Sequence, residues 1–241
     1  MNVDKKTKKK KYKPFSNFGY DLAKITGAPS AVLWIRPKVY YPHGKPNKRG
    51  AILVSSNHIT YIDPIIIQTV FPWRRINCLA TKDFFSSKFK NFIFNQLHCI
   101  AVDKKNFSLA SFHEVVDRLK GGKVVVIFPE GQVNSGGKEP VLAFKSGAIL
   151  MAHRAGVPIL PMYIIKREKW YHRQRVVMGQ PIDVCEMLGK MPSMEDMTRA
   201  SETLREKEVE LREYYESLPI YKKLNAKEKT SESEERTETL L

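Results

Sequence analysis

The feature that most constrains the fold is an alternation, from residue 49 onward, between short apolar runs and longer amphipathic stretches. The apolar runs have the length of buried strands and cover residues 51–55, 76–80, 99–102, 123–128 and 158–164. The stretches between them have helical length and spacing and cover residues 64–70, 83–97, 108–119 and 143–155. Strands that alternate with helices predict an α/β fold with a largely parallel central sheet flanked by helices. Residues 175–180 can add an edge strand, and residues 193–218 predict a long C-terminal helix.

The first 50 residues carry an unbalanced positive charge, with 13 Lys and Arg against two acidic residues and seven lysines between Lys5 and Lys13. Such a block attracts either nucleic acid or the anionic face of a membrane. Binding to nucleic acid would call for basic and aromatic residues spread over one face. Because the excess charge here is concentrated at one end, we expect no nucleic-acid partner and treat a basic nucleic-acid-binding module as the alternative of a different class.

An apolar stripe follows the lysines. Its residues recur at spacings of three and four, as on one face of a helix: Phe15, Phe18, Leu22 and Ile25. Gly27 and Pro29 are expected to interrupt this helix, and residues 31–35, with Trp34, to form a second short one. Basic, Phe and Trp residues together favour a segment lying in a lipid interface. The alternative is that the stripe packs on the protein's own core.

The chain therefore divides into four expected parts: a basic tail (1–13), an amphipathic helical membrane-association segment (14–48), an α/β domain (49–220) and a disordered polar tail (221–241). No run of 18 apolar residues is present, so we expect no conventional membrane-spanning helix. Three cysteines and the lack of a secretory apolar region favour a reducing cytoplasm. A peripheral or monotopic protein on the cytoplasmic face of the cell membrane is the resulting expectation.

A His-x4-Asp pattern occurs twice, at His58 with Asp63 and at His98 with Asp103. In the second pair the intervening residues are predicted to form a strand, which would place its ends roughly 16 Å apart. In the first pair a turn leads into Asp63-Pro64, a helix-start signal with Asp as the cap. Such a turn can bring His58 back to Asp63, although a capping aspartate beside an unrelated histidine remains the alternative.

A histidine held by a carboxylate can act as a general base. The carboxylate holds one imidazole nitrogen and stabilises the charged ring, which leaves the other nitrogen free to take a proton from a substrate hydroxyl. No serine or cysteine nucleophile is then required. The other histidines are dispersed in the sequence, so no metal site is expected.

Residues 57–64, Asn-His-Ile-Thr-Tyr-Ile-Asp-Pro, resemble the first motif of the glycerolipid acyltransferases, which include the 1-acylglycerol-3-phosphate (lysophosphatidic acid) acyltransferases. Three later segments resemble the family's second, third and fourth motifs, in the same order: residues 100–104, 126–131 and 157–161. Residues 144–148 also fit a segment that is usually found between the third and fourth motifs. The resemblance spans residues 50–165 and identifies residues 49–220 as an acyltransferase domain.

The resemblance implies transfer of a fatty acyl group from acyl-CoA or acyl-acyl carrier protein to the free hydroxyl of lysophosphatidic acid, giving phosphatidic acid without a cofactor. His58 would be the general base and Asp63 its orienting partner. Substrate-binding candidates from the same motifs are Asn57, Asp103, Lys104, Lys105, Glu130, Gly131 and Lys145.

Two departures from the family pattern concern the acceptor. Many family members continue Glu-Gly-Thr-Arg-Ser, whereas this chain has Val133 in the position of the arginine. Lys104 likewise occupies the position of an arginine. Lysine keeps the positive charge of arginine but cannot form its bidentate hydrogen bonds to a phosphate, and valine lacks both the charge and the hydrogen bonds. Another lysolipid or an amino-lipid is therefore the alternative acceptor.

Overall fold

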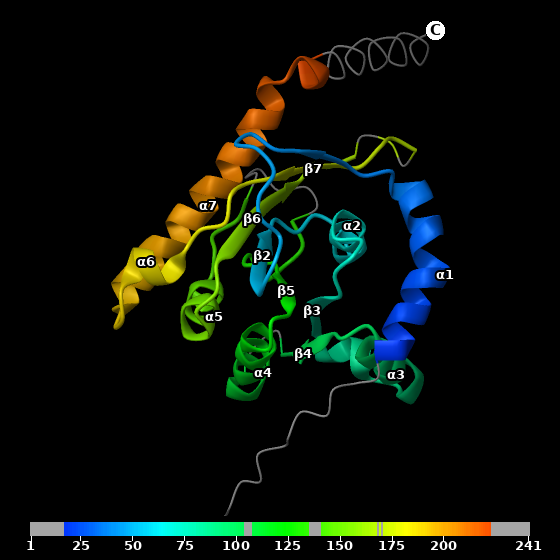
Figure 1. Ribbon diagram of the computed structural model, residues 1–241, viewed down its shortest axis with the longest axis horizontal. Coiled ribbons are helices and arrows are strands. Elements are labelled where there is room, and N and C mark those ends of the chain that lie inside the picture. Colours follow the sequence, from blue (N-terminus) through cyan, green and yellow to red (C-terminus); the bar gives the residue numbers. More distant parts are fainter. Residues whose placement is uncertain (1–16, 104–107, 135–140, 168, 170, 223–241) are drawn as a thin grey trace, which may run out of the picture.

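The computed structural model describes residues 17–103, 108–134, 141–167, 169 and 171–222, and the basic tail 1–13 and residues 223–241 lie outside this part. Its centre is a seven-stranded sheet in the order β1-β7-β6-β2-β5-β3-β4. Only the pairing of β6 with β7 is antiparallel. Helices flank the sheet, as Figure 1 shows, so the predicted α/β class with a largely parallel sheet is confirmed.

Apart from β1, the strands lie on the segments that were predicted to be strands. The strands are β1 (Lys38–Tyr40), β2 (Ile52–Ser56), β3 (Ile76–Thr81), β4 (Ile100–Val102), β5 (Val124–Ile127), β6 (Ile159–Ile164) and β7 (Arg175–Met178). The helices are α1 (Asn17–Ile35), α2 (Asp63–Val70), the short 3-10 helix η1 (Lys82–Phe85), α3 (Lys88–Gln96), α4 (Leu109–Lys120), α5 (Gly147–Ala155), α6 (Val184–Leu188) and α7 (Met194–Ser217).

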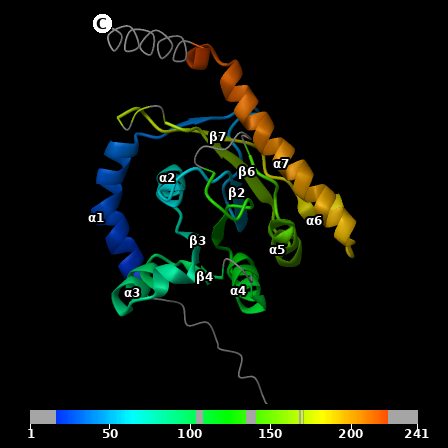
Figure 2. The ribbon, with the colours of Figure 1, turned by 180° about the vertical axis from the view of Figure 1, so that it is seen from behind.

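The two faces of the sheet pack against different helices. Along β2, Ile52 and Val54 join a cluster with residues of α1 and α2, whereas Leu53 joins a cluster with α4, α5 and α7. This follows from the pleat, which turns alternate side chains to opposite faces. Figure 2 shows α1 and α2 on one side of the sheet and α5 and α7 on the other. Because both faces are covered, the central strands β2 and β5 are fully buried; β5 is apolar throughout, and β2 is apolar except for the two serines at its end.

The sheet contains two differences from the sequence-based expectation. Its first strand, β1, comes from within the segment 14–48 that was predicted to be helical, and it pairs in parallel with β7. As a result, the predicted edge strand β7 is second from the edge.

Residues 83–97, which were predicted as one helix, divide into η1 and α3. The Ser87 hydroxyl begins the new helix by accepting a hydrogen bond from the Lys90 backbone N–H at 3.2 Å.

The N-terminal segment forms one helix, so the predicted interruption at Gly27 and Pro29 is wrong. Pro29 lies inside α1. Tertiary contacts at both ends hold the helix: Ile35 is fully buried, and the Tyr20 hydroxyl accepts a hydrogen bond from the Ile76 backbone at 3.0 Å. Contacts of this kind override a local preference for breaking a helix.

Candidate active site

The His58–Asp63 pair forms where β2 ends and α2 begins. Nδ1 of His58 lies 2.8 Å from Oδ2 of Asp63. The aspartate side chain is fully buried, while that of His58 is 16% exposed. With Nδ1 engaged, Nε2 of His58 has no hydrogen-bond partner in the described part of the chain. The turn therefore places a carboxylate-oriented imidazole at the carboxyl edge of the parallel strands, where open α/β sheets bind their ligands.

Asp63 organises the turn that precedes it. Its Oδ2 also accepts hydrogen bonds from the backbone N–H groups of Ile59 at 2.7 Å and Thr60 at 2.9 Å. Its Oδ1 accepts one from the Thr60 hydroxyl at 2.6 Å. The residue before it, Ile62, occupies the cap position of α2, so the predicted role of Asp63 as the helix cap is wrong. The carboxylate instead folds residues 58–60 around itself.

Glu130 and Phe128, which follow the end of β5, also contact His58. Oε1 of Glu130 accepts a hydrogen bond from the His58 backbone N–H at 3.2 Å, and its Oε2 accepts one from the Leu142 N–H at 3.3 Å. Burial raises the pKa of Glu130, and these two amides partly offset that effect. The ring of Phe128 stacks on the imidazole, with centroids 4.1 Å apart and planes 16° from parallel.

Asn57 is fully buried and connects β2 to β6. Its Nδ2 donates to the Ile164 carbonyl at 3.0 Å, and its Oδ1 accepts from the Ile164 N–H at 2.7 Å. The Asn57 side chain thus continues the pairing of the two strands at the base of the turn. Its amide groups are used within the fold.

Gly131 and Lys145, two of the predicted binding residues, lie together. Gly131 has a left-handed backbone with φ of 70°, and a Cβ added to it would come within 2.9 Å of the Lys145 ammonium. The backbone N–H of Lys145 donates to the Pro129 carbonyl at 3.1 Å. The loop that follows Gly131 returns to the turn, where the Asn134 N–H donates to the His58 carbonyl at 2.6 Å. Val133, in the position of the family's arginine, is half-buried in this loop.

The second motif lies farther away. Asp103 follows β4, three strand positions from β2 in the sheet, which corresponds to about 14 Å at the usual strand spacing. Its carboxylate lies 3.5 Å from the ammonium of Lys82. His98, at the other end of β4, packs on the ring of Tyr20. The remaining predicted binding residues, Lys104 and Lys105, lie outside the described part of the chain.

Several supporting residues escaped the sequence analysis. Thr60 and Phe128 belong to the motif segments, but only the fold shows that they contact Asp63 and His58. Glu208 lies on α7 and accepts a hydrogen bond from the Ser55 hydroxyl at 2.6 Å. A signal for it does exist, since this glutamate falls on the stripe of α7 that is otherwise buried: Met197, Ala200, Ser201, Leu204, Leu211 and Tyr215.

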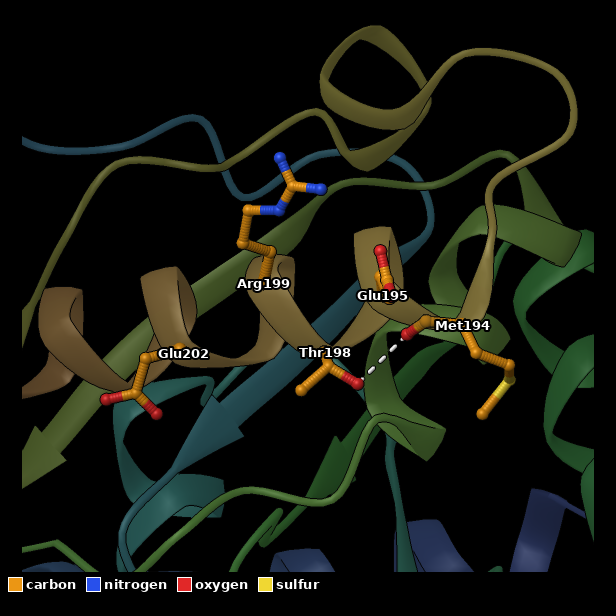
Figure 3. Close-up of a pocket in the computed structure, with 5 residues that line it drawn as sticks. All are labelled: Met194, Glu195, Thr198, Arg199 and Glu202. Atoms are coloured by element: carbon orange, nitrogen blue, oxygen red, sulfur yellow. Dashed lines mark hydrogen bonds between the residues drawn. The ribbon is translucent and has the colours of Figure 1, made fainter.

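The pocket in Figure 3 lies apart from this site. Its lining comes from successive turns at the start of α7: Met194, Glu195, Thr198, Arg199 and Glu202. We assign it no role. In the described ranges no three His, Cys, Asp or Glu side chains are grouped so that they could hold a metal ion.

Exposed apolar side chains lie on α1 and on α3, a helix that contacts α1. The α1–α3 surface comprises Phe18, Leu22, Ile25, Leu33 and Trp34 of α1 and Phe89 and Phe92 of α3. Phe18, Ile25, Leu33 and Phe89 are each more than 70% exposed. Lys88 and Lys90 flank the α3 phenylalanines. The apolar stripe predicted for this segment therefore faces solvent, except for Phe15, which lies outside the described residues. Within those residues, no helix combines the length and apolar character needed to cross a bilayer.

The fold and the pair define an α/β protein with a histidine–carboxylate site at the carboxyl edge of a parallel sheet. The chain belongs to the Acyltransferase family, whose model matches residues 36–165, more than half of the 241 residues. The matched region contains the His58–Asp63 turn, Glu130 and Lys145.

Curated relatives are named 1-acyl-sn-glycerol-3-phosphate acyltransferases. The one from Borreliella burgdorferi is 29% identical over 143 residues, which are 58% of this chain and 56% of the relative. The one from Helicobacter pylori is 28% identical over 181 residues, 73% of each chain. The probable enzyme from Mycoplasma pneumoniae is 30% identical over 141 residues, 54% of this chain and 50% of the relative. The aligned part thus spans about half the length of the first and third of these relatives.

A solved structure shares the fold. The crystal structure of the 1-acyl-sn-glycerophosphate (LPA) acyltransferase PlsC from Thermotoga maritima aligns with a TM-score of 0.57 and 20% sequence identity. The alignment covers 82% of this chain and 80% of that chain. It extends beyond the family-matched region, so the shared architecture includes elements outside residues 36–165.

Proposed function

We propose that this protein transfers a fatty acyl group from an acyl thioester to the free hydroxyl of lysophosphatidic acid, giving phosphatidic acid. The observation that carries the proposal is the His58–Asp63 pair, whose Nδ1–Oδ2 distance of 2.8 Å leaves Nε2 available. Membership of the Acyltransferase family and the names of the relatives support the reaction type and the acceptor. The donor is acyl-CoA or acyl-acyl carrier protein.

The pair performs the reaction in two proton transfers. Nε2 of His58 takes the proton from the acceptor hydroxyl as its oxygen attacks the thioester carbonyl carbon. Asp63 stabilises the imidazolium that forms, and the surrounding amides fix the carboxylate in place. The carbon–sulfur bond then breaks, and the imidazolium returns the proton to the departing thiolate. No covalent acyl-enzyme intermediate is required.

The acceptor phosphate would bind near Gly131 and Lys145. The Lys145 ammonium lies over Gly131, and a cation at this position can pair with a phosphate. Lys104, Lys105 and Asp103 remain proposed contributors to substrate binding. Val133 supplies neither charge nor hydrogen bonds beside the His58 turn, so a lysolipid or amino-lipid without a phosphate at this position remains the second candidate acceptor.

The α1–α3 surface would bind the anionic cytoplasmic face of the cell membrane as a peripheral or monotopic contact. Its aromatic and aliphatic side chains are exposed, and burying them in the lipid interface is favourable. Lys88 and Lys90, together with the lysines of residues 1–13, add attraction to anionic headgroups. The acceptor could then enter the site directly from the bilayer.

The test is transfer of labelled acyl groups from acyl-CoA and from acyl-acyl carrier protein to lysophosphatidic acid in liposomes. His58→Ala should lose at least about a hundredfold in kcat/KM because it removes the general base. The matched control is His113→Ala, which removes an exposed histidine of α4 and should retain activity. Equal activity of His58→Ala and wild type would refute the mechanism. A panel that adds monoacylglycerol and an amino-lipid acceptor decides between the two candidate acceptors.

A further inference from the structure

A buried acidic residue lies behind the His58 turn. Glu208 is on α7, outside the family-matched region, and its side chain is fully buried. Its neighbours on the same face of the helix are Leu204 and Leu211. Burial of an ionised glutamate without a cation in such surroundings is strongly unfavourable in free energy. The presence of Glu208 here therefore calls for a specific role.

The carboxyl group contacts the end of β2, the strand that leads into the His58 turn. Oε1 of Glu208 accepts a hydrogen bond from the Ser55 hydroxyl at 2.6 Å, and the backbone amide of Asn57 also interacts favourably with the carboxyl group. Ser55 and Asn57 are themselves fully buried. Glu208 thus holds β2 within three residues of His58, on the side away from Asp63.

Burial favours the neutral form of Glu208, and this effect exceeds the opposite influence of the Ser55 hydroxyl and the Asn57 backbone N–H, which lower its pKa. Burial is the main cause that raises its pKa well above the usual value, and the negative charge of Glu130 adds to this effect. Tyr163 of β6 interacts electrostatically with Glu208, and burial raises the pKa of this phenol to about 12, so the phenol is neutral. No Lys or Arg side chain forms an ion pair with Glu208 in the described part of the chain.

We propose that Glu208 is a positioning residue of the acyl-transfer site: as a neutral acid, it fixes the end of β2 and thereby sets where His58 meets the acceptor hydroxyl. This inference rests on the proposed acyltransferase function. It assigns part of the site to α7, an element beyond the family-matched residues. The neutral form is essential to the role, because a third negative charge near Asp63 and Glu130 would stabilise the imidazolium already in the resting enzyme, and a protonated His58 cannot take the proton of the acceptor.

Substitutions that separate shape from charge test the proposal in the full-length protein. Glu208→Gln keeps the shape and the hydrogen-bond acceptor, so it should retain kcat and the pH profile of kcat/KM. Glu208→Ala should lower kcat about ten- to a hundredfold with little change in KM, as expected for a misplaced catalytic group. The matched control is Leu204→Ala, which loosens α7 one turn away and should lower stability without changing the pH profile.

Two results in this experiment would overturn the proposal. The first is a Glu208→Ala variant that is folded and as active as wild type. The second is a Glu208→Gln variant whose acidic limb of the pH profile moves to lower pH, since this shift would mean that a negative charge had been removed. Inactive wild-type protein would instead refute the proposed function, and the positioning role must then be tested without turnover.

Two spectroscopic measurements provide that test. The infrared spectrum of wild type at pH 7 should contain the carbonyl band of a protonated carboxylic acid, which Glu208→Gln should lack. In NMR spectra, the backbone amide signals of residues 57–60 should coincide in wild type and Glu208→Gln and move in Glu208→Ala. Absence of the infrared band, or amide signals that do not respond to Glu208→Ala, would refute the proposal whatever the activity.

Discussion

Replacement of Asp63 by Asn separates the charge of this residue from its role in shaping the turn. Asparagine can place its carbonyl oxygen at the position of Oδ2, which accepts the His58 Nδ1–H and the N–H groups of Ile59 and Thr60. Its NH2 group then lies at the position of Oδ1 and can donate to the Thr60 hydroxyl. The geometry of the turn is therefore retained, and only the negative charge is lost.

The magnitude follows from the separation of the pair. At an effective dielectric constant near 20, opposite unit charges about 3 Å apart attract by about 5–6 kcal/mol. A hydrogen bond to the neutral amide oxygen recovers about 1–2 kcal/mol. The difference of about 4 kcal/mol applies only once His58 is charged, as in the transition state, and corresponds to about a thousandfold in kcat/KM.

Single-turnover acyl transfer and urea unfolding measure the two effects separately. Asp63→Asn should lose about a thousandfold in kcat/KM while its free energy of unfolding changes by less than about 1 kcal/mol. Asp63→Ala leaves the N–H groups of Ile59 and Thr60 without acceptors, so it should also lose about 2–6 kcal/mol of stability. An Asp63→Asn variant that keeps more than about a tenth of wild-type kcat/KM would refute the electrostatic role of Asp63.

Two further predictions concern the membrane surface and the stability of the fold. Replacing both Phe89 and Phe92 by Ser should weaken binding to anionic liposomes at least about tenfold in co-sedimentation, since two exposed apolar side chains no longer enter the lipid. The control is the same change at exposed Met191 and Met194, at and just before the start of α7, which packs on the face of the sheet opposite to α1. Equal liposome binding by the phenylalanine variant would exclude this surface. Burial, aided by the nearby charge of Arg118, lowers the pKa of His98 to about 4. The unfolded chain therefore takes up this proton first, and stability should fall as the pH drops from about 6.5 to 4; His98→Asn, which tolerates the φ of 56°, should flatten that fall in urea titrations, and an unchanged slope would contradict the pKa shift.

The central strands of the sheet were predictable from sequence because they are buried on both faces. Residues such as Val124–Ile127 then form uninterrupted apolar runs, and short runs separated by helices point to parallel strands. Helix α1 was predicted in two pieces because Gly27 and Pro29 disfavour a helix locally. Its continuity depends on Ile35 and Tyr20, whose partners come from distant segments.

The residues of the candidate site also include some that the sequence predicts and others that it does not. His58 and Asp63 are five residues apart, so a single turn brings them together and their spacing is visible in the sequence. Ser55 and Glu208 are 153 residues apart, and no local pattern joins them. The one available signal was a charged residue on the buried stripe of α7, which becomes informative only when the face against which α7 packs is known.

The supports of the His58 turn also determine when the site can form during synthesis. Residues 55–63 leave the ribosome early, but the partners that hold them follow 72, 107 and 153 residues later, in Glu130, Ile164 and Glu208. Contacts between residues so far apart in the chain form late and slowly. Under the proposed positioning role of Glu208, a nascent chain that lacks α7 carries the family's motifs without the contact that fixes the His58 turn, and the candidate site is complete only once α7 docks.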